Sequence, residues 1–380
     1  MDYIIDSGLN LSDNMRTRVA VVGAGTAGLI AAKNLAALGI DTNVYERKKR
    51  LGYPPRASGI VSIEGLGSLG ADYRKAVTNT LYGANIHAGG EVMRILSKKP
   101  VAKVLDREIL NDLCYDESVE EGAHVFTGRD INSEMLDELH RRNIIVGADG
   151  AVSAVARHFA MGEIGDHVLT YKAEFAARPR DHRVVDMFFD NNVAPGFFGW
   201  ICPKAKDLTE VGIGIGQGHG NSKSAFDRLL KIKEISEAIG KARMLSSYAS
   251  VIPLRPRERI VDEKEEVLLV GDAAGQVKPT TGGGIVFGGN GAILAARAVR
   301  DHLREGAGLG EYEKAFDSGF GRDLMLHRTL RRIYSGMGKS NLSLLMKAAK
   351  ALGAESFLSK YGDMDRPSAM VRRFFLRNLV

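Results

Sequence analysis

The chain has 380 residues, 44% hydrophobic and 26% charged, which is the composition of an ordinary folded protein and excludes a disordered or fibrous one. Its two cysteines, Cys114 and Cys202, exclude a disulfide framework and a four-cysteine metal or iron–sulfur site, so we expect no metal. The net charge of +6 is uneven: residues 321–380 carry 12 Lys+Arg against 4 Asp+Glu.

This basic C-terminal section fits either a solvated helical tail or a surface for an acidic partner, such as an anionic phospholipid membrane or a phosphorylated substrate. It has no recognisable nucleic-acid-binding motif, so we expect no nucleic-acid partner. No signal peptide and no apolar run of about 18 residues are found in the sequence. We therefore expect a cytoplasmic protein, with residues 370–380 as a candidate peripheral contact with a membrane.

The predicted elements begin after a polar, aperiodic stretch, residues 1–15, which we expect to be a loose extension. A buried strand over 18–22, a helix over 25–38 that stops at Gly39 and a strand over 41–46 make a βαβ unit. Further elements are a strand pair over 82–96, an amphipathic helix over 105–121, and strands over 124–127 and 142–147. Between residues 168 and 251, short alternating segments predict a separate antiparallel sheet, and 267–271 returns to a buried parallel strand. The chain from about Tyr312 onward is predicted to be helical.

The segment Gly23-Ala-Gly-Thr-Ala-Gly28 is a GxGxxG motif placed between the first strand and the first helix. Glycine is needed there for the tight turn, for close approach of a pyrophosphate and for helix–strand contact, and the helix N-terminus then faces the phosphates. Glu46 follows Gly28 at near the spacing expected of an acid that accepts ribose hydroxyls. The motif alone allows NAD, FAD or S-adenosylmethionine.

A second motif narrows this choice. The buried strand 267–271 delivers Asp272 to its C-terminal edge, where the carboxylate is suited to a ribityl chain. The segment Pro279-Thr-Thr-Gly-Gly-Gly-Ile285 then opens a helix whose N-terminus can lie against a flat ring. Glycines at 288, 289 and 291 inside that helix indicate close packing against another element. Together the two motifs predict FAD.

At these residues the sequence resembles the p-hydroxybenzoate-hydroxylase-like FAD superfamily over about 18–303. The segment Gly147-Ala-Asp149-Gly-Ala-Val-Ser153-Ala-Val-Ala-Arg157 is similar to that family's GADGxxSxVR element, and Arg107 matches an arginine that its members place near the flavin. The resemblance implies that FAD is held by Gly23, Gly25, Thr26, Ala27, Gly28, Glu46, Arg47, Ala57, Ser58, Gly59, Arg107, Thr127, Asp149, Asp272, Gly282, Gly283, Gly284 and Ile285.

The predicted fold is therefore α/β, a Rossmann-like FAD-binding domain with an inserted antiparallel-sheet substrate domain and a helical C-terminal section. We expect the FAD-binding domain at 15–75, 97–165 and 258–310, the substrate domain at 76–96 and 166–257, and the helical section at 311–380.

Three further segments resemble archaeal geranylgeranyl reductases: Arg56–Ser62, Pro195–Pro203 together with Gly212-Ile-Gly214, and Tyr361–Pro367. The resemblance implies an FAD-dependent reductase that saturates C=C bonds in geranylgeranyl chains of archaeal membrane phospholipids or their precursors. It implies that Phe198 and Trp200 position the isoprenoid substrate. Ala57 stands where family members often carry cysteine, so this position offers no thiol.

Other functions fit part of the pattern. Flavin monooxygenases and halogenases share the fold, and halogenases also have a tryptophan-rich motif that ends in proline. An electron-transfer flavoprotein or a non-catalytic, FAD-bound lipid carrier is the alternative from a different class. The sequence assigns no proton donor: Cys202 and the tyrosines are candidates, although Cys202 is more typical of a small buried hydrophobe. The electron donor is left open between NAD(P)H and a ferredoxin-like protein.

Overall fold

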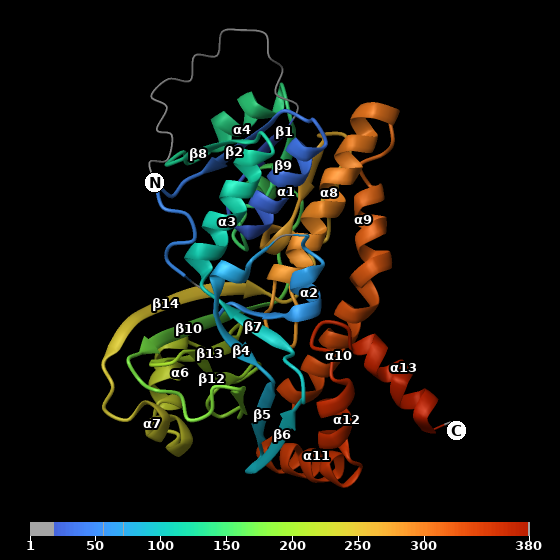
Figure 1. The fold of residues 1–380 in the computed structure, drawn as a ribbon. Coiled ribbons are helices and arrows are strands. Elements are labelled where there is room, and N and C mark those ends of the chain that lie inside the picture. The colour runs from blue at the N-terminus through green and yellow to red at the C-terminus, as the bar shows by residue number, and fades with distance from the viewer. Residues whose placement is uncertain (1–18, 56, 71, 379–380) are drawn as a thin grey trace.

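The computed structural model describes residues 19–55, 57–70 and 72–378 (Figure 1). The expected N-terminal extension, Arg18 and Arg56 lie outside the described residues, as do the side chains from 374 onward in the candidate membrane segment. The described residues form three sheets, with helices packed around the two larger ones and a helical section at the C-terminal end.

The first sheet contains the predicted βαβ unit. Its strand order is β15-β16-β9-β1-β2-β8, and all neighbours are parallel except β15 with β16. Both faces of β1 are buried, as the continuous apolar run predicts for a central parallel strand. Because the chain passes from β1 to β2 on one side and returns to β9 on the other, the strand order reverses at β1, where open α/β sheets bind ligands. The strands are β1 (Val19–Val22), β2 (Thr42–Glu46), β8 (His124–Thr127), β9 (Ile144–Gly147), β15 (Val261–Asp262) and β16 (Val267–Leu269).

Helix α1 (Thr26–Ala37) packs between α3 (Arg107–Glu120) and α8 (Ile285–Glu305) on one side of this sheet (Figure 1). The predicted stop at Gly39 is present: its φ is +75°, and its N–H donates to the carbonyl of Ala36. The shorter helices α4 (Ser133–His140) and α5 (Ala154–His158) lie before and after β9.

The second sheet has the order β14-β10-β13-β12-β11-β5-β6. It is antiparallel except that β5 runs parallel to β11, which differs from the purely antiparallel sheet that we expected. The β5–β6 hairpin comes from an earlier part of the chain, so no hairpin turn joins β5 to β11 and sets their directions. The strands are β5 (Gly83–Ala88), β6 (Glu91–Leu96), β10 (His167–Phe175), β11 (Val184–Phe189), β12 (Gly199–Ala205), β13 (Leu208–Gly216) and β14 (Met244–Pro253).

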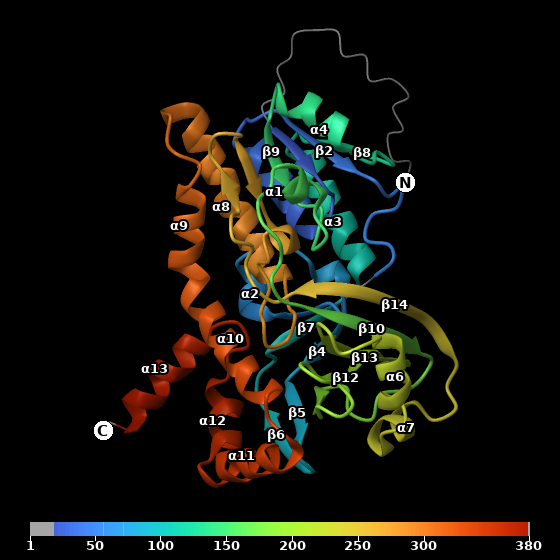
Figure 2. The ribbon, with the colours of Figure 1, turned by 180° about the vertical axis from the view of Figure 1, so that it is seen from behind.

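The two faces of the second sheet have different neighbours. One is covered by α6 (Ser222–Leu229) and α7 (Lys233–Ile239), whose apolar side chains form a core with alternate residues of β10 and β13. The other face lines a pocket together with the loop that leads into α8, and the second sheet lies below the first (Figure 2). A third sheet of order β3-β7-β4 connects the two larger ones and was not expected from the sequence; it contains β3 (Ile60–Ser62), β4 (Val77–Leu81) and β7 (Ala102–Leu105). The short helices α2 (Ile63–Gly67) and η1 (Arg74–Ala76) flank it.

The last part of the described chain is helical, as predicted. It comprises α9 (Glu311–Phe316), a π-helical stretch (Asp317–Gly321), α10 (Arg322–Ser335), α11 (Lys339–Ala351), α12 (Ala354–Tyr361) and α13 (Pro367–Asn378). Helices α11 and α12 pack on β6, at one edge of the second sheet (Figure 2). The α/β fold class is confirmed, whereas the exact domain boundaries stay a prediction.

Candidate functional site

The GxGxxG turn joins β1 to α1. A side chain is excluded at two of its glycines, because a Cβ on Gly23 would lie 2.5 Å from the carbonyl oxygen of Ala148, and one on Gly28 would lie 2.0 Å from the carbonyl oxygen of Gly23. Gly23 also has a φ of +104°. A Cβ on Gly25 would meet no described atom within 4 Å. The middle glycine therefore leaves open space beside the uncapped N-terminus of α1, where a phosphate is stabilised by free N–H groups.

The C-terminal ends of β2 and β8 form the side of this site expected to hold a ribose. Glu46 accepts hydrogen bonds from the N–H groups of Ala24 (2.8 Å) and Lys48 (2.9 Å), which fixes its carboxylate beside the glycine turn. Thr127 lies opposite Glu46 in the ladder, and Arg47 is exposed.

Arg107 and Asp272 come together from α3 and the turn η2 (Gly271–Ala273). The Arg107 guanidinium donates from Nη2 to Thr26 Oγ1 at 3.0 Å, while its buried Nη1 has no hydrogen-bond partner among the described residues. Burial lowers the pKa of Arg107, and the negative charge of Asp272 opposes this effect. Asp272 is exposed, and its carboxylate accepts no hydrogen bond from a described residue.

These unpaired groups test whether the site fits a dinucleotide. Buried polar groups are normally hydrogen-bonded, so the unpartnered Nη1 of Arg107 indicates a binding site for a polar ligand, and the exposed carboxylate of Asp272 lies near it. A cofactor with phosphates and a ribityl chain offers acceptors to Arg107 and hydroxyl donors to Asp272. The side chains of Arg107 and Asp272 therefore fit FAD.

Asp149 is oriented differently from the other predicted cofactor residues. Its Oδ1 accepts from the hydroxyl of Ser153 at 2.6 Å, and its Oδ2 accepts from the N–H groups of Ala154 (2.6 Å) and Val155 (3.2 Å). The carboxylate thus caps the start of α5. These bonds hold the turn after β9 against the glycine motif.

The loop of three glycines leads into α8. Gly282 has a φ of +74°, and helix α8 begins at Ile285 without a side-chain cap, so its first N–H groups are available to a ligand. A Cβ on Gly288 would lie 2.9 Å from the Cα of Gly271, which explains the glycine inside the helix: α8 touches the backbone next to Asp272.

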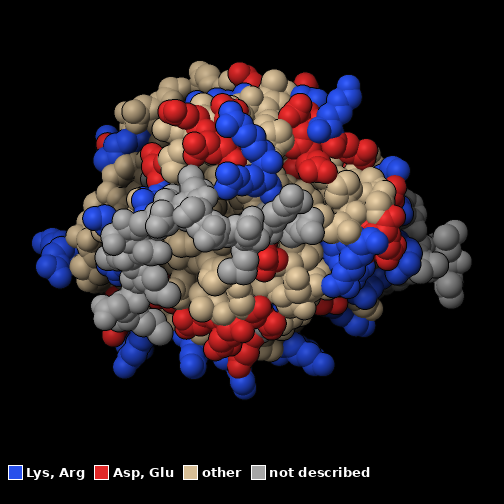
Figure 3. Space-filling model, turned by 90° about the horizontal axis from the view of Figure 1, so that it is seen from above, with Lys and Arg blue, Asp and Glu red and all other residues tan. Residues whose placement is uncertain are grey.

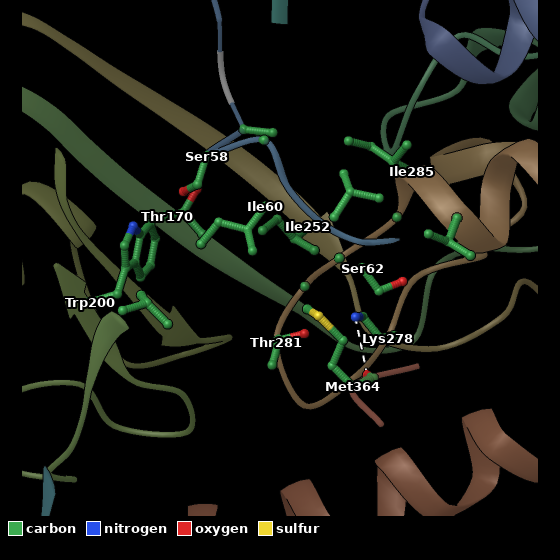
Figure 4. A pocket seen from close by; sticks show the side chains of 18 of the residues that line it. Ser58, Ile60, Ser62, Thr170, Trp200, Ile252, Lys278, Thr281, Ile285 and Met364 are labelled. Atoms are coloured by element: carbon green, nitrogen blue, oxygen red, sulfur yellow. Dashed lines mark hydrogen bonds between the residues drawn. The ribbon is translucent and has the colours of Figure 1, made fainter. Parts of the chain in front are cut away.

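A cavity of about 180 Å³ opens between these loops and the second sheet (Figure 4). Trp200 lies on one side and Ile285 on the other, with Ile60 and Ile252 between them (Figure 4). Its lining comes from regions that are far apart in the sequence, namely the 57–62 segment, the inner face of the second sheet, the 278–286 loop, and residues 364 and 365. The predicted flavin loops and the predicted substrate aromatics therefore share one cavity.

The aromatic wall, defined as Phe197, Phe198 and Trp200, depends on glycines in the neighbouring strand β13. A Cβ on Gly212 would lie 2.1 Å from Cζ2 of Trp200, and one on Gly214 would lie 2.4 Å from Cδ1 of Phe197. Side chains alternate along a strand, so Gly212 and Gly214 leave a hollow on one face of the sheet while Ile213 and Ile215 enter the core on the other face. The aromatic rings fill this hollow. The centroids of Phe197 and Phe198 are 4.4 Å apart.

Glu210 is the centre of a buried charged cluster next to the aromatic wall. This cluster was not predicted from the sequence. Its carboxylate accepts from Trp200 Nε1 at 2.9 Å, from Lys172 Nζ at 2.7 Å and from the hydroxyl of Ser58. Burial alone raises the pKa of Glu210, but the positive charges of Lys172 and Lys204 and the hydrogen bonds outweigh it and bring the pKa to about 2. The carboxylate is thus ionised at neutral pH.

A second buried ion pair closes the opposite side of the cavity. Lys278 Nζ lies 2.5 Å from Asp365 Oδ1 and also donates to the carbonyl of Met364, while Ser62 donates to Asp365 Oδ2. The predicted Tyr361–Pro367 segment therefore reaches the cavity from the helical C-terminal section. Cys202 is fully buried and outside the cavity lining, and burial raises its pKa to about 12, in agreement with its interpretation as a small hydrophobe.

Residues 16–314 match the family model described as the FAD binding domain. The chain belongs to this FAD-binding family. The predicted cofactor is confirmed, and the groove from the glycine turn to the cavity is its candidate site.

Among the relatives of this FAD-binding protein is the digeranylgeranylglycerophospholipid reductase of Methanothrix thermoacetophila, 27% identical, with 89% of this chain and 92% of that protein covered. The resemblance predicted from the sequence is thereby confirmed. A geranylgeranyl bacteriochlorophyll reductase-like structure from Thermoplasma acidophilum has a TM-score of 0.79 at 20% identity, covering 93% of this chain and 94% of that one. A myxobacterial chondrochloren halogenase has a TM-score of 0.66 at 17% identity, covering 93% and 92%. At these identities the two structures show the fold alone.

The predicted FAD residues fall into two groups along the groove. The glycine turn, Glu46, Arg47, Thr127, Arg107 and Asp272 lie at the edge of the first sheet, whereas residues 57–59 and 282–285 line the cavity. FAD is an extended molecule with its phosphates and its flavin ring at different places, so it suits two such groups. Its individual contacts with these residues stay predictions. Seen from above the cofactor-binding sheet, acidic and basic side chains are interspersed (Figure 3).

Proposed function

We propose that this chain is an FAD-dependent reductase that saturates C=C bonds in geranylgeranyl chains of archaeal membrane phospholipids or of their precursors. The observation that carries the proposal is the shared cavity, in which an apolar and aromatic surface faces the loops expected to hold the flavin ring. The archaeal relatives named as reductases of such lipids support the same substrate class.

The side chains around the cavity suit an isoprenoid chain. Met187, Phe198, Trp200 and Ile252 present hydrocarbon and aromatic surface, which attracts an apolar chain and excludes water from the reacting carbons. Trp200 is held in place by its hydrogen bond to Glu210 and by the glycine beneath its ring. A fixed wall limits the orientations of the bound double bond, and this kind of orientation accounts for a large part of many rate enhancements.

When bound and reduced, FAD supplies the hydride for the alkene. The glycine turn and Arg107 would bind its phosphates, and Asp272 would accept hydrogen bonds from its ribityl hydroxyls. The loop at 282–284 would bring backbone N–H groups and the N-terminus of α8 to the ring. An electron donor is required, and we propose either NAD(P)H or a ferredoxin-like protein.

Peripheral membrane contact is the second part of the proposal, because lipid substrates reside in the bilayer. Among the described residues, no helix is both long and apolar enough to cross a membrane. Helix α11 buries Leu342 and Met346, yet it exposes Leu344, Leu345 and Lys347 on another face. Exposed apolar residues mixed with cations suit the surface of an anionic bilayer.

Anaerobic mixing experiments test the proposal. The dithionite-reduced protein is mixed with a geranylgeranyl phospholipid, and the absorbance of oxidised flavin should return as the lipid takes up the electrons. A saturated analogue of the same lipid serves as the control and should leave the flavin reduced. If the flavin remains reduced with both lipids, the proposed reductase activity is wrong, and the non-catalytic carrier is favoured.

A second assay distinguishes the proposed lipid reductase from an oxygenase or a halogenase. The halogenase similarity concerns the fold, and both classes consume oxygen when a bound substrate is present. Rapid substrate-stimulated oxygen uptake with NAD(P)H would favour that class over a lipid reductase. We expect the lipid to produce no such stimulation.

A further inference from the structure

Three charged side chains beside the cavity are almost completely removed from water. Lys172 is 2% exposed, Lys204 is 6% exposed and Glu210 is 0% exposed. They come from the adjacent strands β10, β12 and β13, and Lys172 lines the cavity itself. Ionised groups are rarely buried unless they are paired, because removing them from water costs several kcal/mol per ion.

The two ammonium groups are fixed to the loop expected to contact the flavin ring. Lys172 Nζ donates to the carbonyl of Ala57 at 3.1 Å, and Lys204 Nζ donates to the carbonyl of Ser58 at 2.7 Å. Glu210 joins them through its ion pair with Lys172 at 2.7 Å and its hydrogen bond from the hydroxyl of Ser58. These charges therefore have fixed positions directly behind the 57–59 segment.

Two cations and one anion leave this triad with a net charge of +1. Glu174 lies opposite Glu210 in the ladder, but it is partly exposed and accepts from the hydroxyl of Ser246 at 3.2 Å, so water screens its charge. Across the cavity, Lys278 and Asp365 form a pair with no net charge. Among the described residues, the buried charges around the cavity therefore sum to +1, which favours a negatively charged ligand.

We propose that the Lys172–Glu210–Lys204 triad stabilises the negative charge of the reduced FAD ring and raises its reduction potential. Two electrons and one proton convert the oxidised ring to a reduced ring with one additional negative charge. Fixed charges in a dry site stabilise such a change without reorganising. The proposal rests on the proposed placement of the ring against residues 57–59, and it is independent of which lipid is reduced.

The test is the two-electron reduction potential of FAD in the purified holoprotein, measured by spectroelectrochemical titration without any substrate. Lys172→Met and Lys204→Met should each lower the potential, by at least a tenfold shift in the reduction equilibrium, or about 30 mV for a two-electron couple. The matched control is Lys206→Met, which removes the same charge from the exposed turn between β12 and β13 and should leave the potential unchanged.

A charge-restoring variant separates electrostatics from structural damage. Lys172→Met combined with Glu210→Gln removes one cation and one anion, so the net charge returns to +1 and the potential should return toward the wild-type value. The proposal would be overturned if the reduction potentials of Lys172→Met and Lys204→Met equalled that of the control. It would also be overturned if the reduction potential of the double variant were as low as that of Lys172→Met. Since no lipid is present, the predicted shifts would stand even if the anaerobic lipid assay failed.

Discussion

At the residue scale, the position of the Trp200 ring depends on the absence of a side chain at Gly212. Trp200 is the chain's single tryptophan, and its ring lies where the side chain of Gly212 would otherwise be. Glu210 accepts from its indole N–H, so both the flat face and the polar edge of the ring are fixed. Intrinsic tryptophan fluorescence therefore reports on the aromatic wall alone.

Replacing Gly212 with alanine should move that ring. The added methyl group would overlap Trp200, and overpacking of this kind costs roughly 1–3 kcal/mol. We expect a shifted emission maximum and easier quenching by acrylamide, together with a lower free energy of unfolding. Gly319→Ala is the control, because a Cβ there meets no described atom within 4 Å. An emission spectrum identical to that of the wild type would show that Trp200 does not lie against Gly212.

Asp272→Ala should weaken FAD binding. The change removes an acceptor placed in the groove beside Arg107, and a hydrogen bond to a charged group contributes roughly 1.5–3 kcal/mol, which is about a tenfold to hundredfold change in Kd. Titration of the apoprotein with FAD, followed by the quenching of flavin fluorescence, measures it. Asp207→Ala, at an exposed turn, should bind like the wild type. Equal affinity in both variants would remove Asp272 from the site.

At the scale of elements, the sequence predicted those whose signal is local. Strands such as β1 and β16, buried on both faces, follow from uninterrupted apolar runs, and the glycine turn follows from its spacing. The three-stranded sheet was missed because β3 and β7 have three and four residues and no clear alternation. Lys172 and Glu210 were missed because a charged residue in an alternating strand usually faces solvent. Their burial depends on partners from β12 and the 57–58 loop, which the sequence does not bring together.

His327 illustrates how helix α10 is joined to the cavity. It is buried, its Nδ1 lies 2.8 Å from the hydroxyl of Thr280, and its Nε2 lies 3.2 Å from the carbonyl of Asp365. Burial, reinforced by the charge of Lys278, lowers its pKa to about 4. The neutral ring is therefore the form that connects α10 to the 278–281 loop and to the segment before α13.

This lowered pKa predicts a pH dependence of stability. Between about pH 4 and pH 6.5 the unfolded chain binds a proton at this histidine and the folded chain does not, so stability rises with pH in that window. The contribution lost on acidification amounts to about 3 kcal/mol at most. In His327→Gln the slope of unfolding free energy against pH should be smaller over that window. Urea unfolding at several pH values measures it, with exposed His124→Gln as the control; equal slopes in wild type and His327→Gln would contradict the assignment.

At the scale of the whole molecule, the cofactor groove, the aromatic wall and the C-terminal helices come from different parts of one chain. The first sheet holds the dinucleotide groove, the second supplies the aromatic wall, and the C-terminal helices bring Met364 and Asp365 to the cavity that lies between them. The same helices carry exposed apolar and basic side chains, such as Leu344 and Lys347. We therefore propose that the section that closes the cavity also carries the membrane contact.

Removal of the residues after Met370 should reduce binding to vesicles that contain anionic lipid. The removed segment includes cations, each of which contributes about 1 kcal/mol near an anionic surface. Co-sedimentation at low and high salt measures the effect, and neutral vesicles serve as the control. Undiminished binding of the shortened chain would assign membrane contact to another surface, such as the exposed face of α11.

The central claim is that reduced FAD in this chain saturates isoprenoid double bonds, and product mass tests it most directly. Purified protein is reduced with dithionite under anaerobic conditions and incubated with a digeranylgeranyl phospholipid, and the lipid is then extracted for mass spectrometry. The account predicts products heavier by the mass of two hydrogens for each double bond reduced, and none with the apoprotein. Recovery of the fully unsaturated lipid from active, FAD-loaded protein would contradict it.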